Sequence, residues 1–161
     1  MSRILIVDDE PIIRRFLADG LEDVGYQVTT ARNGAEALIR AREQHSDIVL
    51  LDLLMPVMDG VTFLRQRQAF PPLARVPVVV LSAAGIDALR IANKLRATAV
   101  LAKPVDLEAL STVIEHVLCQ WTPAADRYGV HSIEEALNSA SLHRLWQDSL
   151  RCGLHDCRHT L

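Results

Sequence analysis

Short apolar runs alternate with segments of helical spacing along roughly the first 120 residues of the chain. The runs are rich in β-branched residues and almost continuously apolar, which is typical of parallel strands covered on both faces. They lie at Ile4–Val7, Val28–Thr30, Ile48–Leu51, Val76–Leu81 and Thr98–Ala102. The alternation predicts an α/β fold in which a βα unit is repeated five times around a five-stranded, parallel, doubly wound sheet.

The segments between these runs carry signals for helix starts and stops. Pro11 follows two acidic residues and predicts a helix start, and Gly25 predicts its end. Apolar residues recur in this helix at three- and four-residue spacing: Ile12, Ile13, Phe16, Leu17 and Leu21. A second helix is predicted from Asn33, a third from Asp59 or Gly60, and a fourth from Asp87 through Leu95.

A last helix of the set is predicted to start at Asp106, which is a good N-cap residue. Its spacing places six apolar residues on one face: Leu107, Leu110, Ile114, Val117, Leu118 and Trp121. Residues 1–121 are therefore predicted to form one domain. The composition of residues 122–131 predicts a linker, and a capping-box pattern of Ser132 and Glu135 predicts a helical extension over 132–161, of unknown role.

Composition excludes several classes of protein. The chain has 161 residues, 50% of them hydrophobic, and a formal net charge of -3, so it has enough apolar residues for a core and no basic excess to hold nucleic acid. No apolar stretch reaches the roughly 20 residues of a membrane span, and the first residues do not resemble a signal peptide. Three cysteines near one end do not make a disulfide framework. We expect a cytoplasmic protein that does not bind membranes or DNA.

Acidic residues follow two of the predicted strands. Asp8 and Asp9 come directly after the first strand, and Asp52 follows the third. If these strands are neighbours, the three carboxylates converge and repel one another. A hard divalent cation bound between them would offset this repulsion most simply, and Mg²⁺ is expected before softer metals. The alternative is that each aspartate only caps a helix or ends a strand, which leaves the coincidence of all three unexplained.

Two further strand ends carry hydrogen-bond donors. The fourth strand ends in Ser82, and the fifth is followed by Lys103 and Pro104. A hydroxyl and an ammonium beside a metal-bound carboxylate are suited to hold the oxygens of a transferred phosphoryl group. This pattern indicates phosphoryl chemistry at one edge of the sheet.

Four motifs follow one another along the chain: Ile4 to Glu10 (ILIVDDE), Asp52 to Gly60 (DLLMPVMDG), Ser82 to Ala84 (SAA) and Lys103-Pro104. In this order they resemble the receiver domain of two-component response regulators, over residues 3 to about 120. The resemblance implies a flavodoxin-like, chemotaxis-type fold. It also implies that Asp52 accepts a phosphoryl group from a histidine kinase or histidine phosphotransfer protein, with the catalytic help of Ser82 and Lys103.

The resemblance further implies a magnesium site. Asp9 and Asp52 would be direct Mg²⁺ ligands, Asp8 would act through water, and the backbone carbonyl of Leu54 would be another ligand. Phosphorylation would then switch contacts with a downstream protein whose identity the sequence does not reveal.

One position departs from the family pattern, and two others govern the lifetime of the phosphoryl group. Val100 stands where many receivers carry an aromatic residue, so a two-rotamer aromatic switch is not expected. Leu54 and Ala84 are apolar at the two positions that govern phosphoryl lifetime and cannot orient an attacking water. We therefore expect slow self-hydrolysis of the aspartyl phosphate.

Three classes of function remain open. The leading one is a receiver without a separate effector, which acts through protein contact or as a relay and is not an enzyme. The second is the receiver end of a larger regulator whose DNA-binding or enzymatic output lies outside this chain. The third is an Asp-nucleophile phosphohydrolase, disfavoured because Leu54 replaces the general acid that such enzymes need.

The roughly 40 residues after Trp121 are too few for most output domains, and their balanced charges disfavour DNA binding. One expected assembly is a homodimer, formed through the fourth and fifth helices or through the C-terminal helix. Four terminal residues could in principle bind zinc, but their crowding lacks the separated ligand pairs of structural sites. They are Cys152, His155, Cys157 and His159.

Overall fold

The computed structural model describes residues 1–83, 90 and 94–121. The linker at 122–131 and the extension at 132–161 lie outside the described residues, as do Ala84, the terminal cysteines and histidines, and most of the helix predicted from Asp87 through Leu95. Within the described part, no helix is long and apolar enough to cross a membrane.

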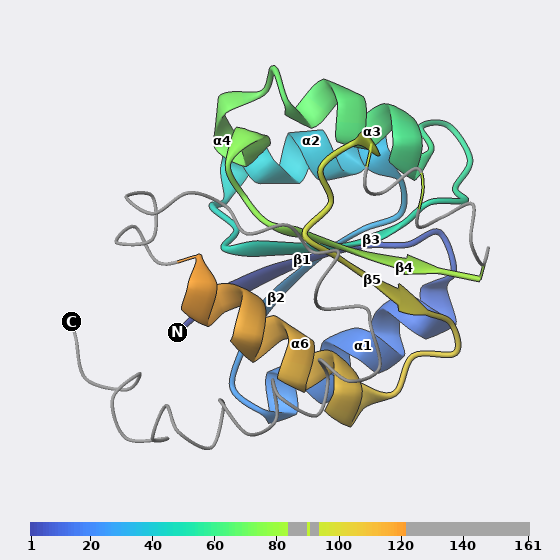
Figure 1. Ribbon diagram of the computed structural model, residues 1–161. Helices are drawn as coiled ribbons and strands as arrows, with labels where there is room; N and C mark the ends of the chain where they lie inside the picture. Colours follow the sequence, from blue (N-terminus) through green and yellow to red (C-terminus); the bar gives the residue numbers. More distant parts are fainter. Residues whose placement is uncertain (84–89, 91–93, 122–161) are drawn as a thin grey trace. The chain divides into compact units, whose positions relative to one another are not determined.

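Five parallel strands form a single sheet in the order β2-β1-β3-β4-β5 (Figure 1). Their bounds are β1 Arg3–Val7, β2 Gln27–Ala31, β3 Ile48–Asp52, β4 Val78–Ser82 and β5 Ala99–Ala102. The strand order reverses direction between β1 and β3, which is where doubly wound sheets bind their ligands. The predicted α/β fold is confirmed, and each strand lies within two residues of its predicted bounds.

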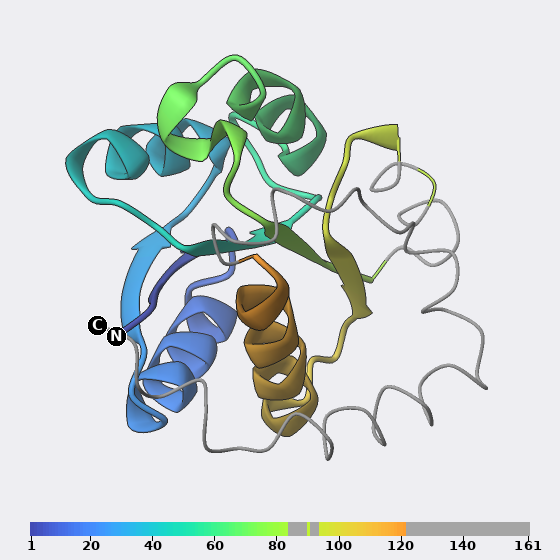
Figure 2. The ribbon, with the colours of Figure 1, turned by 60° about the vertical axis from the view of Figure 1, so that its left-hand side comes forward.

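Helices cover both faces of the sheet. The helices α1 and α6 lie side by side on one face, and α2, α3 and the short α4 lie on the other (Figures 1 and 2). Their bounds are α1 Pro11–Asp23, α2 Gly34–Glu43, α3 Gly60–Arg67, α4 Pro71–Ala74 and α6 Leu107–Gln120.

Local capping explains where these helices begin. The side chain of Asn33 accepts a hydrogen bond from the N–H of Glu36, and that of Asp59 accepts one from the N–H of Thr62 at 2.7 Å. Asp106 accepts one from the N–H of Ala109. Each side chain satisfies an otherwise unpaired donor of the first turn. The predicted N-cap at Asp106 and the predicted helix starts at Asn33 and at Asp59 or Gly60 are therefore confirmed.

The strands divide the core into two layers because successive side chains point to opposite faces of a sheet. In β1, Ile4 and Ile6 pack with α1 and α6, whereas Leu5 and Val7 pack with α2 and α3. The strand β3 continues both layers and is buried along its whole length. This burial explains why the strands read as continuous apolar runs.

Two of the predicted apolar helix faces are only partly buried. Leu17 and Leu21 of α1 are buried, but Ile12 is 82% exposed and Phe16 is also exposed. Trp121, assigned by its spacing to the buried face of the last helix, lies beyond the end of α6 and is half exposed. The reason is geometric: an apolar stripe wider than the sheet can cover leaves its outer residues in solvent.

Candidate functional site

The carboxyl ends of β1 and β3 bring the three predicted aspartates together. Val7 and Leu51 are paired in the sheet, so the residues that follow them emerge at the same edge. Asp8, Asp9 and Asp52 can each offer a carboxylate oxygen within 4.8 Å of the others. Asp8 and Asp52 are buried, and Asp9 is half-buried.

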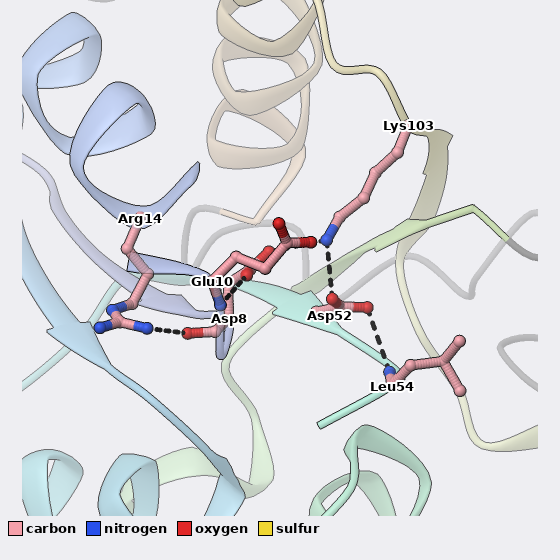
Figure 3. A network of polar contacts seen from close by, with 6 residues as sticks. All are labelled: Asp8, Glu10, Arg14, Asp52, Leu54 and Lys103. Carbon is pink, nitrogen blue, oxygen red and sulfur yellow. Dashed lines mark hydrogen bonds and ion pairs between the residues drawn. The ribbon is translucent and has the colours of Figure 1, made fainter. Parts of the chain in front are cut away.

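Lys103 comes from the end of β5 and bridges two of these carboxylates. Its Nζ donates to Asp52 Oδ2 at 2.7 Å and to Asp8 Oδ2 at 2.8 Å (Figure 3). Burial acts to lower the pKa of Lys103, but the hydrogen bonds and charges of Asp52 and Asp8 outweigh it, so this pKa is raised. The lysine is therefore a fixed cation against the two buried carboxylates.

Backbone groups hold the acidic side chains in position. The N–H of Leu54 donates to Asp52 Oδ1 at 3.1 Å, and the N–H of Glu10 donates to Asp8 Oδ1 at 2.8 Å (Figure 3). The guanidinium of Arg14, one turn into α1, donates to the carbonyl of Asp8 at 2.6 Å. Sequence reasoning missed this contact, because an arginine near a helix start is usually solvated.

The loop after β3 passes very close to the candidate acceptor. Gly60 donates its N–H to the carbonyl of Leu53 at 3.0 Å. A Cβ at Gly60 would stand 2.7 Å from the Cα of Leu53 and would overlap the backbone carbonyl of Asp52. Glycine is therefore required here by close backbone approach.

Ser82 and Leu54 stand at the same edge of the sheet. Ser82 is buried at the end of β4, and its carbonyl accepts from the N–H of Lys103 at 3.1 Å. Leu54 is exposed at the start of the β3–α3 loop. Val100 packs on the α2–α3 side of the core, where an aliphatic side chain fills space without a polar end. The remaining rim position, Ala84, lies outside the described residues.

The donor set fits a hard divalent cation. Three carboxylates face one ammonium, which leaves an excess of two negative charges in a partly desolvated site. Carboxylate oxygens are the ligands preferred by Mg²⁺, which usually keeps several waters when it binds through one or two carboxylates. The residues therefore have the chemistry of a magnesium site that can also receive a phosphoryl group.

Known proteins share both sequence and fold with this chain. Residues 4–115 match the family described as the response regulator receiver domain. Protein PilH of Pseudomonas aeruginosa is 36% identical over 119 residues, which cover 73% of this chain and 98% of PilH. The regulatory protein AtoC of Escherichia coli is 34% identical over 119 residues, but these cover only 25% of AtoC.

Among solved structures, the Vibrio cholerae chemotaxis protein CheY4 superposes with a TM-score of 0.69 at 31% identity, covering 73% of this chain and 98% of CheY4. The relatives are signalling proteins, and receiver domains generally bind Mg²⁺ through acidic residues and interact with histidine kinases and downstream proteins. The family match spans more than half of the chain and agrees with the strand order and the acidic cluster. The chain therefore belongs to the response regulator receiver domain family of two-component signal transduction.

Proposed function

We propose that Asp52 is the phosphoacceptor of this receiver and that its donor is the phosphohistidine of a histidine kinase or histidine phosphotransfer protein. The observation that carries this proposal is the position of Asp52, which is held by Lys103 and the Leu54 N–H while lying within the acidic cluster. These contacts orient the carboxylate at the edge where doubly wound sheets bind ligands.

The transfer is a nucleophilic substitution at phosphorus. A carboxylate oxygen of Asp52 forms the new P–O bond, the donor's P–N bond breaks, and the imidazole leaves with the bonding electrons and takes up a proton. Lys103 and Ser82 would bind phosphoryl oxygens as charge develops on them. Lys103 must then exchange one of its carboxylate contacts for the phosphoryl group.

Mg²⁺, when bound, would offset the charge of the carboxylates and of the incoming phosphoryl group. Asp9 and Asp52 would be its direct ligands, Asp8 would act through water, and the carbonyl of Leu54 would complete the protein's share. Asp8 and Asp52 each accept hydrogen bonds from Lys103 and from one backbone N–H, so the assignment of Asp8 to water-mediated binding rests on the family resemblance alone.

The test is phosphorylation by a small donor. The protein is incubated with acetyl phosphate and Mg²⁺, and its intact mass is measured beside that of the Asp52→Asn variant and of a sample with chelator. We expect one phosphoryl adduct that requires both Asp52 and the metal. An adduct that persists in Asp52→Asn would overturn the assignment of the acceptor.

The lifetime of the adduct is a separate part of the proposal. Leu54 is exposed at the rim and carries no group that could orient water, so we infer slow self-hydrolysis. Replacing Leu54 by Asn or Glu, which can hold a water, should shorten the lifetime. Equal decay of Leu54→Asn and the wild type would contradict this account.

The response to phosphorylation would be a change in protein contacts, with action in the cytoplasm. A second candidate, the receiver end of a larger regulator, is favoured by AtoC, in which the matched region is about a quarter of the protein. We also propose that residues 122–131 form a linker, that residues 132–161 form a helical extension, and that the chain forms a homodimer. Sedimentation with and without phosphorylation distinguishes a dimerising receiver from one that acts on a different protein.

A further inference from the structure

The carboxylate of Asp9 differs from those of Asp8 and Asp52 in how it is held. Asp8 and Asp52 each accept hydrogen bonds from Lys103 and from a backbone N–H. Among the residues that the structure describes, no donor binds the Asp9 carboxylate, although it offers an oxygen within 4.8 Å of an oxygen of each of the other two. Like charges at this distance repel, so an Asp9 side chain that was free to turn would point to solvent.

The backbone on both sides of Asp9 is held instead. On the amino side, the carbonyl of Asp8 accepts from the guanidinium of Arg14 at 2.6 Å (Figure 3). On the carboxyl side, the N–H of Glu10 donates to Asp8 Oδ1 at 2.8 Å. Because each peptide group is planar, these two contacts fix the peptides that flank Asp9 and with them the two backbone torsions that direct its side chain.

Arg14 provides a donor where the sheet can no longer provide one. The N–H of Asp8 still donates to the carbonyl of Ala31 at 3.1 Å, but β2 ends at Ala31 and α2 begins at Gly34. Asp8 is fully buried, so its carbonyl needs a partner from the protein. Among the described residues, Arg14 is the one donor to this carbonyl.

The helix that carries this guanidinium starts rigidly. Pro11 is the first residue of α1, and its ring fixes the backbone there. The N–H of Arg14 donates to the carbonyl of Glu10 at 3.0 Å. Arg14 therefore binds the carbonyls on both sides of Asp9, that of Asp8 through its side chain and that of Glu10 through its backbone.

We propose that Arg14 is a positioning residue for Asp9, which holds the Asp8 carbonyl so that the Asp9 carboxylate stays directed into the acidic cluster. The proposal rests on the proposed function, in which Asp9 is a direct Mg²⁺ ligand. Groups that orient a ligand without touching the metal commonly change metal affinity by about 10- to 100-fold. The charge of Arg14 acts in the opposite direction, because removal of a cation from an acidic site strengthens the binding of another cation. The sign of the change in affinity therefore separates positioning from charge.

The test measures metal affinity directly. Mn²⁺, which shares the preference of Mg²⁺ for carboxylate oxygens, is titrated into each protein and the free ion is followed by electron paramagnetic resonance, with Mg²⁺ as competitor. We expect Arg14→Met to bind both ions about tenfold more weakly, and Arg14→Lys, which keeps the charge but loses the planar fork, to lie between Arg14→Met and wild type. Arg15→Met is the matched control, since Arg15 is 84% exposed and pairs with Asp19, so its affinity should not fall.

Circular dichroism of each variant gives the fraction that is folded, to which the affinity is referred. Arg14→Met that binds as wild type does, or more tightly, overturns the proposal, and a loss of stability without a loss of affinity shows that Arg14 supports only the fold. If Arg14→Met does not fold, Arg14→Lys decides: weaker binding supports positioning, and wild-type affinity overturns it.

Asp9→Asn separates this proposal from the proposed function. If Asp9→Asn binds Mn²⁺ weakly and Arg14→Met binds it as wild type does, Asp9 is a ligand that Arg14 does not position. If wild type binds neither ion, or Asp9→Asn binds both as wild type does, the metal ligands of the proposed function are wrong and the positioning role of Arg14 is refuted with them.

Discussion

Replacing Arg67 by Met tests what the buried guanidinium at the end of α3 contributes to stability. Arg67 is buried, and it donates to the carbonyls of Leu73 at 3.2 Å, Val76 at 2.8 Å and Arg96 at 3.0 Å. These carbonyls lie in α4, before β4 and before β5. One side chain therefore joins three segments that precede the strands carrying Ser82 and Lys103.

The expected cost follows from the partners that Arg67→Met would leave behind. The carbonyl of Leu73 keeps a second donor, the N–H of Val76 at 3.2 Å, whereas those of Val76 and Arg96 lose the guanidinium. An unsatisfied buried carbonyl costs about 1–3 kcal/mol, which applies to Val76. The bond to Arg96, an exposed residue, is only part-buried and adds about 1 kcal/mol, so the total is about 2–4 kcal/mol. Burial of the charge lowers the pKa of Arg67, and its Nε has no hydrogen-bond partner among the described residues. Relief of this penalty reduces the net loss to about 1–3 kcal/mol.

The assay is urea unfolding followed by circular dichroism, with Arg65→Met as the matched control. Arg65 lies on the same helix and is exposed, so its replacement should change the free energy of unfolding by less than about 0.5 kcal/mol. We expect Arg67→Met to lower the midpoint with an unchanged slope. If Arg67→Met is as stable as wild type or more stable, desolvation outweighs the hydrogen bonds and the reasoning is wrong.

Three further predictions concern the site and its supports. Gly60→Ala should abolish phosphorylation by displacing the backbone of Asp52, whereas Gly20→Ala, whose Cβ would meet only the flexible end of a leucine, should leave the phosphoryl adduct measured by mass unchanged. Lys103→Met should leave two buried carboxylates without a cation and lower the melting temperature at neutral pH, and added Mg²⁺ should restore more stability to this variant than to wild type. Hydrogen bonds from the Thr62 backbone and side chain lower the pKa of Asp59 from 3.8, so its cap stabilises the fold above that value and is lost as the pH falls further. Asp59→Asn should flatten the acid limb of a stability profile, and an unchanged limb would contradict this assignment.

The sequence was sufficient to predict the acidic site because its geometry follows from strand topology. Parallel strands end at one edge, so Asp8, Asp9 and Asp52 converge once β1 and β3 are neighbours. Lys103 was predicted for the same reason, at the end of β5. Its specific hydrogen bonds to Asp8 and Asp52 were not predicted, because they depend on side-chain conformations that spacing does not determine.

Other features depend on tertiary contacts that a local pattern does not contain. Arg67 lies at the end of a helix where a charged residue is usually solvated, and its burial arises from α4 and the segment before β5. Helix α4 itself is only four residues long and was not predicted. For Ile12, the apolar pattern was present but the sheet provides no surface to cover it.

The two ends of β5 are held by different kinds of contact. At its amino end, Arg67 binds the carbonyl of Arg96, a neutral group whose charge does not change. At its carboxyl end, Lys103 binds Asp52, the group that phosphorylation would modify. Among the described strands, β5 is at the edge of the sheet and pairs with β4 alone. We therefore expect a rearrangement of Lys103 to displace the carboxyl end of β5 while Arg67 keeps its amino end in place. With Val100 as an aliphatic residue in this strand, a change in the position of β5 itself, rather than rotation of an aromatic ring, would carry the phosphorylation signal away from the site.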